Sequence, residues 1–149
     1  MSGLARYFTG QGAVADGLAP AAREPYRLLL VDDEPGVLRA LTRVFRQEAY
    51  EVLTAANAVE GLACLRAQTI HLVISDYLMP GMNGAEFLKQ VKQLSPDTLR
   101  IMLTGHADTG AVMGAINEGA VYKFILKPWN DDDLRITVAL ALEQFDLVR

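Results

Sequence analysis

Several apolar segments that the sequence predicts as strands are followed directly by residues that can do chemistry. Asp32 and Asp33 follow the first of these segments, and Asp76, Thr104 and Lys127 follow three later ones. In an open parallel sheet the carboxyl ends of the strands lie along one edge, where ligands bind. We therefore expect three carboxylates, one hydroxyl and one ammonium group to meet in a small cleft.

Such a cleft predicts a hard cation and phosphoryl transfer. Two carboxylates about 4 Å apart repel by roughly 4 kcal/mol at an effective dielectric of 20, and one lysine cannot neutralise three of them. Oxygen ligands without a nearby His or Cys favour Mg²⁺, which keeps open positions for phosphate oxygens. Lys127 and Thr104 suit the remaining phosphate oxygens, as phosphoryl transfer requires.

The nucleophile of this cleft must be a carboxylate, because no Ser–His or Cys–His pair accompanies it. Asp76 is the best candidate, since it stands alone after the central strand. Asp32 and Asp33 form the natural metal pair.

Short apolar runs alternate with helical periodicity from Tyr26 onward. Runs such as Leu28–Val31 are continuously apolar, which is typical of strands buried on both faces of a parallel sheet. Asn57 and Asn130 stand where helix N-caps are expected. The pattern predicts a doubly wound α/β domain with a five-stranded parallel sheet flanked by five helices. Strands are predicted over residues 27–31, 51–55, 71–75, 100–103 and 121–126, and helices near 36–48, 58–68, 84–94, 109–118 and 131–147.

Composition excludes several other classes of protein. The chain has 149 residues, of which 51% are hydrophobic and 21% charged, with a net charge of −4. An acidic domain of this kind has no means of holding a nucleic-acid backbone, so direct nucleic-acid binding is not expected. The sequence predicts no membrane span and no signal peptide, and its one cysteine, Cys64, fits a reducing, cytoplasmic location.

Residues 1–24 differ from the rest because Gly, Pro and Ala interrupt any apolar period. We interpret them as a flexible N-terminal leader, and a docking arm using Leu4, Tyr7 and Phe8 is the alternative. Residues 25–149 are interpreted as the folded domain.

Four motifs resemble the receiver domain of two-component response regulators, over residues 26 to about 145. They are Val31–Pro35 (VDDEP), Ser75–Gly84 (SDYLMPGMNG), Leu103–Ala107 (LTGHA) and Phe124–Trp129 (FILKPW). The resemblance implies a flavodoxin-like fold with strand order 2-1-3-4-5. It further implies that Asp76 accepts a phosphoryl group from a sensor histidine kinase, a phosphotransfer protein or a small phosphodonor.

The resemblance also implies roles for neighbouring residues. Asp33, Asp76 and the backbone carbonyl of Leu78 would bind Mg²⁺, and Asp32 would act mainly through water. Thr104 would swing toward the phosphoryl group and Phe124 would turn inward. The Lys127–Pro128 peptide bond is expected to be cis.

Two residues in this resemblance depart from the family pattern. Leu78, two residues after Asp76, and His106, two residues after Thr104, occupy the positions that help to set the phosphoryl lifetime. An apolar Leu78 should exclude water, whereas His106 could orient it, so the lifetime stays open.

The last predicted helix carries two apolar stripes. A helix that only covers a sheet needs one. The second stripe predicts a further partner, which could be a second copy of this chain or an output domain. The surface of the fourth helix, fifth strand and fifth helix is expected to change shape on phosphorylation and to control a downstream protein. The first stripe contains Leu134, Val138, Ala141, Leu142 and Phe145, and the second contains Ile136, Leu140 and Leu147.

Two other functions compete with a signalling phosphoacceptor that only gains and loses its own phosphoryl group. A Mg²⁺-dependent phosphatase with an aspartyl nucleophile would need a cap over its substrate and a second acid where Leu78 stands. A receiver-like interaction module that is never phosphorylated would not need the complete acid set.

Overall fold

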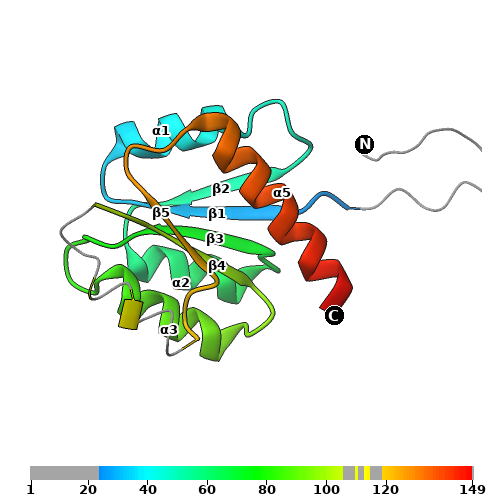
Figure 1. The fold of residues 1–149 in the computed structure, drawn as a ribbon. Helices are drawn as coiled ribbons and strands as arrows, with labels where there is room; N and C mark the ends of the chain where they lie inside the picture. Colours follow the sequence, from blue (N-terminus) through cyan, green and yellow to red (C-terminus); the bar gives the residue numbers. More distant parts are fainter. Residues whose placement is uncertain (1–23, 106–109, 111–112, 115–118, 149) are drawn as a thin grey trace, which may run out of the picture.

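Apolar strands buried by helices on both sides form the centre of the protein. The computed structural model describes residues 24–105, 110, 113–114 and 119–148. Its five strands are all parallel and lie in the order β2-β1-β3-β4-β5 (Figure 1), as the resemblance implied. The strands are β1 (Arg27–Val31), β2 (Glu51–Ala55), β3 (Leu72–Asp76), β4 (Leu99–Thr104) and β5 (Lys123–Leu126).

Four helices whose bounds lie within the described residues cover the two faces of this sheet. They are α1 (Pro35–Val44), α2 (Ala58–Ala67), α3 (Gly84–Leu94) and α5 (Asp131–Val148). The helices α1 and α5 lie on one face, and α2 and α3 lie on the other (Figure 1). The helix predicted near residues 109–118 lies mostly outside the described residues.

Alternate side chains of the central strands build a separate core on each face, as the pleat of a strand requires. On β1, Leu28 and Leu30 pack toward α1 and α5, whereas Leu29 packs toward α2 and α3. All three are fully buried. Phe87 of α3 and Leu41 of α1 are buried in the two cores. The centre of the sheet is thus held from both sides, which gives the strand ends a rigid base.

Most predicted element bounds agree with the structure to within one residue. The prediction for α1 was too long, because the amides of Phe45 and Arg46 bond to carbonyls three residues earlier and close the helix after Val44. The prediction for β5 began two residues too early. Both predicted N-caps are confirmed: Asn57 accepts a hydrogen bond from the amide of Glu60, and Asn130 accepts one from Asp133.

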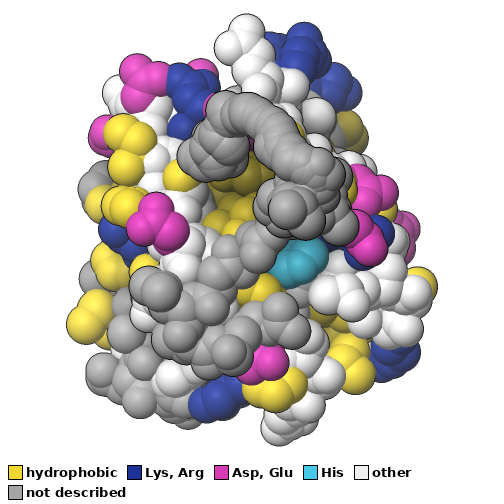
Figure 2. All heavy atoms as spheres, turned by 90° about the vertical axis from the view of Figure 1, so that its right-hand side faces the viewer, with side chains coloured by type: hydrophobic (Ala, Val, Ile, Leu, Met, Phe, Trp, Pro, Cys, Tyr) yellow, Lys and Arg dark blue, Asp and Glu magenta, His cyan; other side chains and the backbone are white. Residues whose placement is uncertain are grey.

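Aromatic rings pack together at the end of the sheet where the strands begin. The ring of His71 lies edge-on to those of Tyr26 and Phe145, with centroids 5.3 and 5.2 Å away. The Nδ1 atom of His71 accepts a hydrogen bond from the amide of Arg27 at 2.9 Å. Figure 2 looks toward this side of the molecule and shows hydrophobic side chains surrounded by acidic and basic ones. His71 therefore has a structural role here, joining β1, β3 and α5.

The helix α5 carries one buried and one exposed apolar stripe. Leu134, Val138 and the other members of the first stripe are buried against the sheet. In the second stripe, Ile136 and Leu140 are 58% and 57% exposed, and the side chain of Leu147 lies outside what the structure describes. Within the described part of the chain, no helix combines the length and the apolar character needed to cross a membrane.

Candidate functional site

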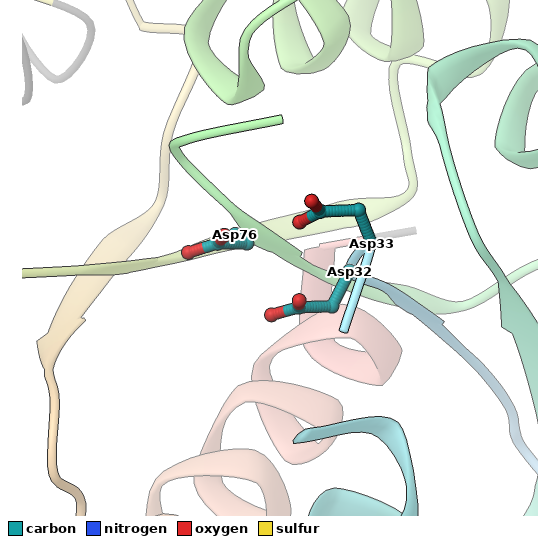
Figure 3. A group of neighbouring side chains, drawn as sticks. All are labelled: Asp32, Asp33 and Asp76. Atoms are coloured by element: carbon teal, nitrogen blue, oxygen red, sulfur yellow. The ribbon is translucent and has the colours of Figure 1, made fainter. Parts of the chain in front are cut away.

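Three carboxylates meet at the carboxyl edge of the sheet. Asp32 and Asp33 follow β1, and Asp76 is the last residue of the neighbouring strand β3. One carboxylate oxygen from each residue lies within 4.8 Å of one from each of the others. Figure 3 shows the three side chains extending to the same side of the two strands. The structure therefore brings together the three acids that the sequence predicted would meet.

The ammonium group of Lys127 lies among these carboxylates. Lys127 follows β5 at the edge of the sheet, yet its Nζ lies 2.8 Å from Asp76 Oδ1 and 3.6 Å from Asp32 Oδ2. The backbone amide of Lys127 donates to the carbonyl of Thr104 at 2.9 Å, and the Lys127–Pro128 bond is cis, as expected. The side chain thus reaches past β4 to the acids at the centre of the sheet.

The pKa values of Asp32 and Lys127 are both raised, for different reasons. Burial raises the pKa of the Asp32 carboxyl, and the nearby Asp76 charge raises it further, against a backbone hydrogen bond from Glu34 and the Lys127 charge. Burial by itself would lower the pKa of Lys127. The hydrogen bond to Asp76 and the surrounding carboxylates outweigh that effect, so the Lys127 pKa lies above its usual value.

One oxygen of Asp32 is buried and incompletely satisfied. Asp32 is fully buried, and its Oδ1 accepts a hydrogen bond from the Glu34 amide at 2.9 Å. Its Oδ2 has no hydrogen-bond partner among the described residues. Lys127 Nζ, 3.6 Å away, offsets part of its charge but makes no hydrogen bond to it, so burying this oxygen is costly and a bound cation would lower that cost. With three oxygen donors converging and no sulfur or imidazole among them, these acids fit a hard divalent cation such as Mg²⁺.

Thr104 ends β4, between the strands that supply the lysine and the acids. It is buried, and its neighbour Leu103 pairs with Asp76 across the sheet. Its hydroxyl donates to the carbonyl of Gly105 at 3.1 Å. The hydroxyl therefore lies at the carboxyl edge of the sheet, where the sequence predicted it.

The start of α3 packs directly against the backbone of Asp76. The Gly84 amide donates to the Tyr77 carbonyl at 2.8 Å. A Cβ added at Gly84 would overlap the carbonyl oxygen of Asp76 and lie 2.9 Å from Tyr77 Cα. Asn83 and Glu86 form a reciprocal capping box that fixes the first turn of the helix. A close approach of this kind accepts only glycine.

Sequence reasoning assigned no role to Gly84 or to Ser75, whose buried hydroxyl donates to the Asp76 carbonyl. A glycine at the first position of a helix was a weak signal, since Gly36 in the first turn of α1 has no such close neighbour. A serine inside an otherwise apolar strand was another weak signal.

The structure describes two of the three remaining predicted site residues, Leu78 and Phe124. Leu78 is 64% exposed, so its side chain borders the solvent. Phe124 is partly buried against the core beneath α2 and α3. His106 lies outside the described residues.

Comparison with known proteins identifies the family. The model of the response regulator receiver domain matches residues 28–139, which include the three acids, Thr104 and Lys127. The chain belongs to the response regulator receiver family. Members of this family are phosphoacceptors of two-component signalling rather than conventional enzymes.

Relatives of this receiver occur both inside longer regulators and as nearly the whole of short proteins. It is 40% identical over 116 residues to the hydrogenase transcriptional regulatory protein HoxA of Cupriavidus necator, covering 78% of this chain and 24% of that protein. It is 31% identical over 112 residues to sporulation initiation phosphotransferase F of Bacillus subtilis, and the match covers 75% of this chain and 90% of that protein. The signal receiver domain of an HD domain-containing protein from Pseudomonas fluorescens superposes with a TM-score of 0.80 at 33% identity. The match covers 86% of this chain and 94% of that structure. The chain thus spans about a quarter of the length of HoxA.

Proposed function

We propose that Asp76 accepts a phosphoryl group from the phosphohistidine of a sensor histidine kinase or phosphotransfer protein, or from a small phosphodonor. The observation that carries this proposal is the convergence of three carboxylates and Lys127 Nζ at one edge of the sheet. Asp76 is the acceptor because it ends the central strand and pairs directly with the lysine. Asp32 is fully buried, and Asp33 is exposed.

Mg²⁺ would be held by Asp33, Asp76 and the backbone carbonyl of Leu78, with Asp32 acting through water. The unsatisfied Oδ2 of Asp32 supports a cation at this place. When bound, the ion supplies positive charge beside the phosphoryl oxygens, which lowers the repulsion between them and the attacking carboxylate.

The chain's own residues carry out the transfer. An Asp76 carboxylate oxygen forms a bond to phosphorus while the phosphorus–nitrogen bond of phosphohistidine breaks, and the imidazole nitrogen keeps the electron pair. Lys127, already 2.8 Å from Asp76, can donate to a phosphoryl oxygen that replaces the carboxylate as its partner. Thr104 exchanges its Gly105 acceptor for another phosphoryl oxygen.

Movement of Thr104 links the site to the surface that signals. Thr104 pairs with Leu126 of β5, and Phe124 lies two residues earlier on that strand, opposite Met102. A shift of the Thr104 side chain leaves space that Phe124 fills by turning inward. The resulting change in the face of β5, α5 and the predicted helix at residues 109–118 alters partner binding.

The exposed second stripe of α5 supports a partner on this face. Ile136 and Leu140 are both more than half exposed, and Leu126 of β5 is 38% exposed. The partner is a second copy of this chain, a downstream protein or an output domain such as those that accompany receivers in transcriptional regulators. We place this signalling in the cytoplasm, with no direct contact to nucleic acid or membrane.

Leu78 and His106 would set how long the phosphoryl group lasts. Leu78 follows Asp76 by two residues and has an exposed apolar side chain, where a polar residue could guide water. We expect Leu78→Asn to change the autodephosphorylation rate severalfold. A lifetime equal to that of the unmodified chain would contradict this role.

The proposal is tested with acetyl phosphate and Mg²⁺, using intact mass and the fluorescence of Trp129, the single tryptophan. The wild-type chain should gain the mass of one phosphoryl group, and Asp76→Asn should gain none. Asp97→Asn, which alters an exposed aspartate preceding β4, is the matched control and should behave as wild type. The proposal would be contradicted if Asp76→Asn were phosphorylated at the wild-type rate, or if the wild-type chain were not phosphorylated.

A further inference from the structure

The backbone carbonyl of Asp76 is enclosed by two residues outside the acid cluster. The Ser75 hydroxyl donates to this carbonyl at 3.0 Å, from a fully buried position. Gly84 comes so close that a Cβ there would overlap the same oxygen. The peptide between Asp76 and Tyr77 is therefore held by a side-chain hydroxyl and by the first turn of α3.

A hydroxyl at position 75 calls for an explanation, because its surroundings are apolar. Its partners in register on the neighbouring strands are Val31 and Met102, which both belong to the core beneath α2 and α3. Burying a hydroxyl there costs free energy unless it is hydrogen-bonded, and an alanine or valine would suit the burial better. The bond that Ser75 makes is to the residue proposed as phosphoacceptor.

We propose that Ser75 is a positioning residue for the phosphoacceptor, whose hydroxyl holds the Asp76–Tyr77 peptide against the start of α3 and so fixes the direction of the Asp76 carboxylate. This inference rests on the proposed function of Asp76. The carbonyl and the carboxylate branch from the same short stretch of chain, where β3 leaves the sheet. A small rotation of the peptide therefore moves the carboxylate relative to Lys127 Nζ, now 2.8 Å away. Displacements well below 1 Å are enough to slow a reaction that depends on alignment.

The chain offers a matched control at the opposite end of the same strands. Thr98 is also buried, and its Oγ1 donates to the backbone carbonyl of Ile70 at 2.7 Å. Thr98 precedes β4 and Ile70 precedes β3, so this bond lies at the end of the sheet away from the acids. Thr98→Val removes this buried hydroxyl–carbonyl bond, together with the bond between the Thr98 and Ser95 hydroxyls at 2.6 Å, without touching the Asp76 peptide. Ser75→Ala removes the bond that the proposal concerns.

Three measurements on the full chain test the proposal: urea unfolding, hydrogen exchange of the Gly84 amide without Mg²⁺, and the rate of phosphorylation by acetyl phosphate with Mg²⁺. Both variants should be destabilised. Only Ser75→Ala should exchange the Gly84 amide faster than the loss of global stability of that variant explains. Only Ser75→Ala should be phosphorylated more slowly, by about threefold to tenfold. Ser75→Thr, which keeps the hydroxyl, should restore both values toward wild type.

The proposal is overturned if Ser75→Ala is phosphorylated at the wild-type rate, or if Thr98→Val slows the reaction equally. A wild-type chain that accepts no phosphoryl group would refute the proposed function instead. In that case Gly84 exchange still decides the positioning role, because it needs no phosphodonor. If the added methyl group of Ser75→Thr prevents folding, the comparison of Ser75→Ala with Thr98→Val stands without it.

Discussion

Replacing Lys127 by methionine should destabilise the protein strongly without Mg²⁺ and weakly with it. The Lys127 ammonium lies 2.8 Å from Asp76 and 3.6 Å from Asp32, and the carboxylate oxygens of the acid cluster lie within 4.8 Å of one another. Methionine keeps the length and apolar stem of the side chain but removes its charge. Without a bound cation, the repulsion between the Asp32 and Asp76 carboxylates in the variant is no longer offset by the lysine charge.

The size of the effect follows from these distances. At an effective dielectric of 20, unit charges at 2.8 and 3.6 Å attract by about 6 and about 5 kcal/mol. Desolvation cancels part of this attraction, and removing one partner of a buried ion pair costs roughly 3–5 kcal/mol. Because the Lys127 side chain is 29% exposed, we expect the lower end, a loss of about 3 kcal/mol.

Urea unfolding measured in EDTA and in saturating Mg²⁺ checks this prediction. The loss of about 3 kcal/mol should appear in EDTA and fall below about 1 kcal/mol with Mg²⁺, because the variant binds the ion more tightly and gains more stability from it. Lys123→Met is the control, since Lys123 is an exposed lysine at the start of the same strand. It should change the unfolding free energy by less than about 0.5 kcal/mol in both buffers.

Two results would refute the electrostatic explanation. Equal losses for Lys127→Met in the two buffers would mean that the side chain acts through its packing. A loss in EDTA no larger than that of Lys123→Met would mean that the carboxylates do not depend on the lysine charge.

Three further predictions concern single residues of the site. Asp32→Asn should raise the unfolding free energy in EDTA at pH 7. Because the pKa of Asp32 is higher in the folded than in the unfolded chain, this gain should shrink as the pH falls toward about 4. Urea titrations at several pH values measure it. Gly84→Ala should cost about 2–3 kcal/mol of stability, because the new Cβ overlaps the Asp76 carbonyl. Gly36→Ala should not destabilise the protein, because the nearest atom to its new Cβ is Arg39 Nη2 at 3.7 Å. Thermal unfolding of the two variants distinguishes these outcomes. Asn83→Ala removes the capping box and should cost about 1 kcal/mol in the same assay, and no change would contradict the role of the cap.

The sequence by itself was sufficient to predict the sheet and the residues at its carboxyl edge. Continuous apolar runs such as Leu28–Val31 are local patterns, and strands buried on both faces require a parallel sheet covered by helices. Once the strands are parallel, residues that follow them must share an edge, whatever the details of packing. Asp76, Thr104 and Lys127 could therefore be placed together before any distance was known.

Only the tertiary structure distinguished residues that look equivalent in the sequence. Asp32 and Asp33 are adjacent acids, yet Asp33 is exposed and Asp32 is fully buried, with one oxygen that has no hydrogen-bond partner among the described residues. Which of them faces inward depends on how the chain turns after β1, where Lys127, which follows β5, comes within 3.6 Å of Asp32. The contact of Gly84 with the Asp76 carbonyl likewise depends on where α3 docks. Such differences arise from contacts between segments far apart in the chain, which no local pattern of residues records.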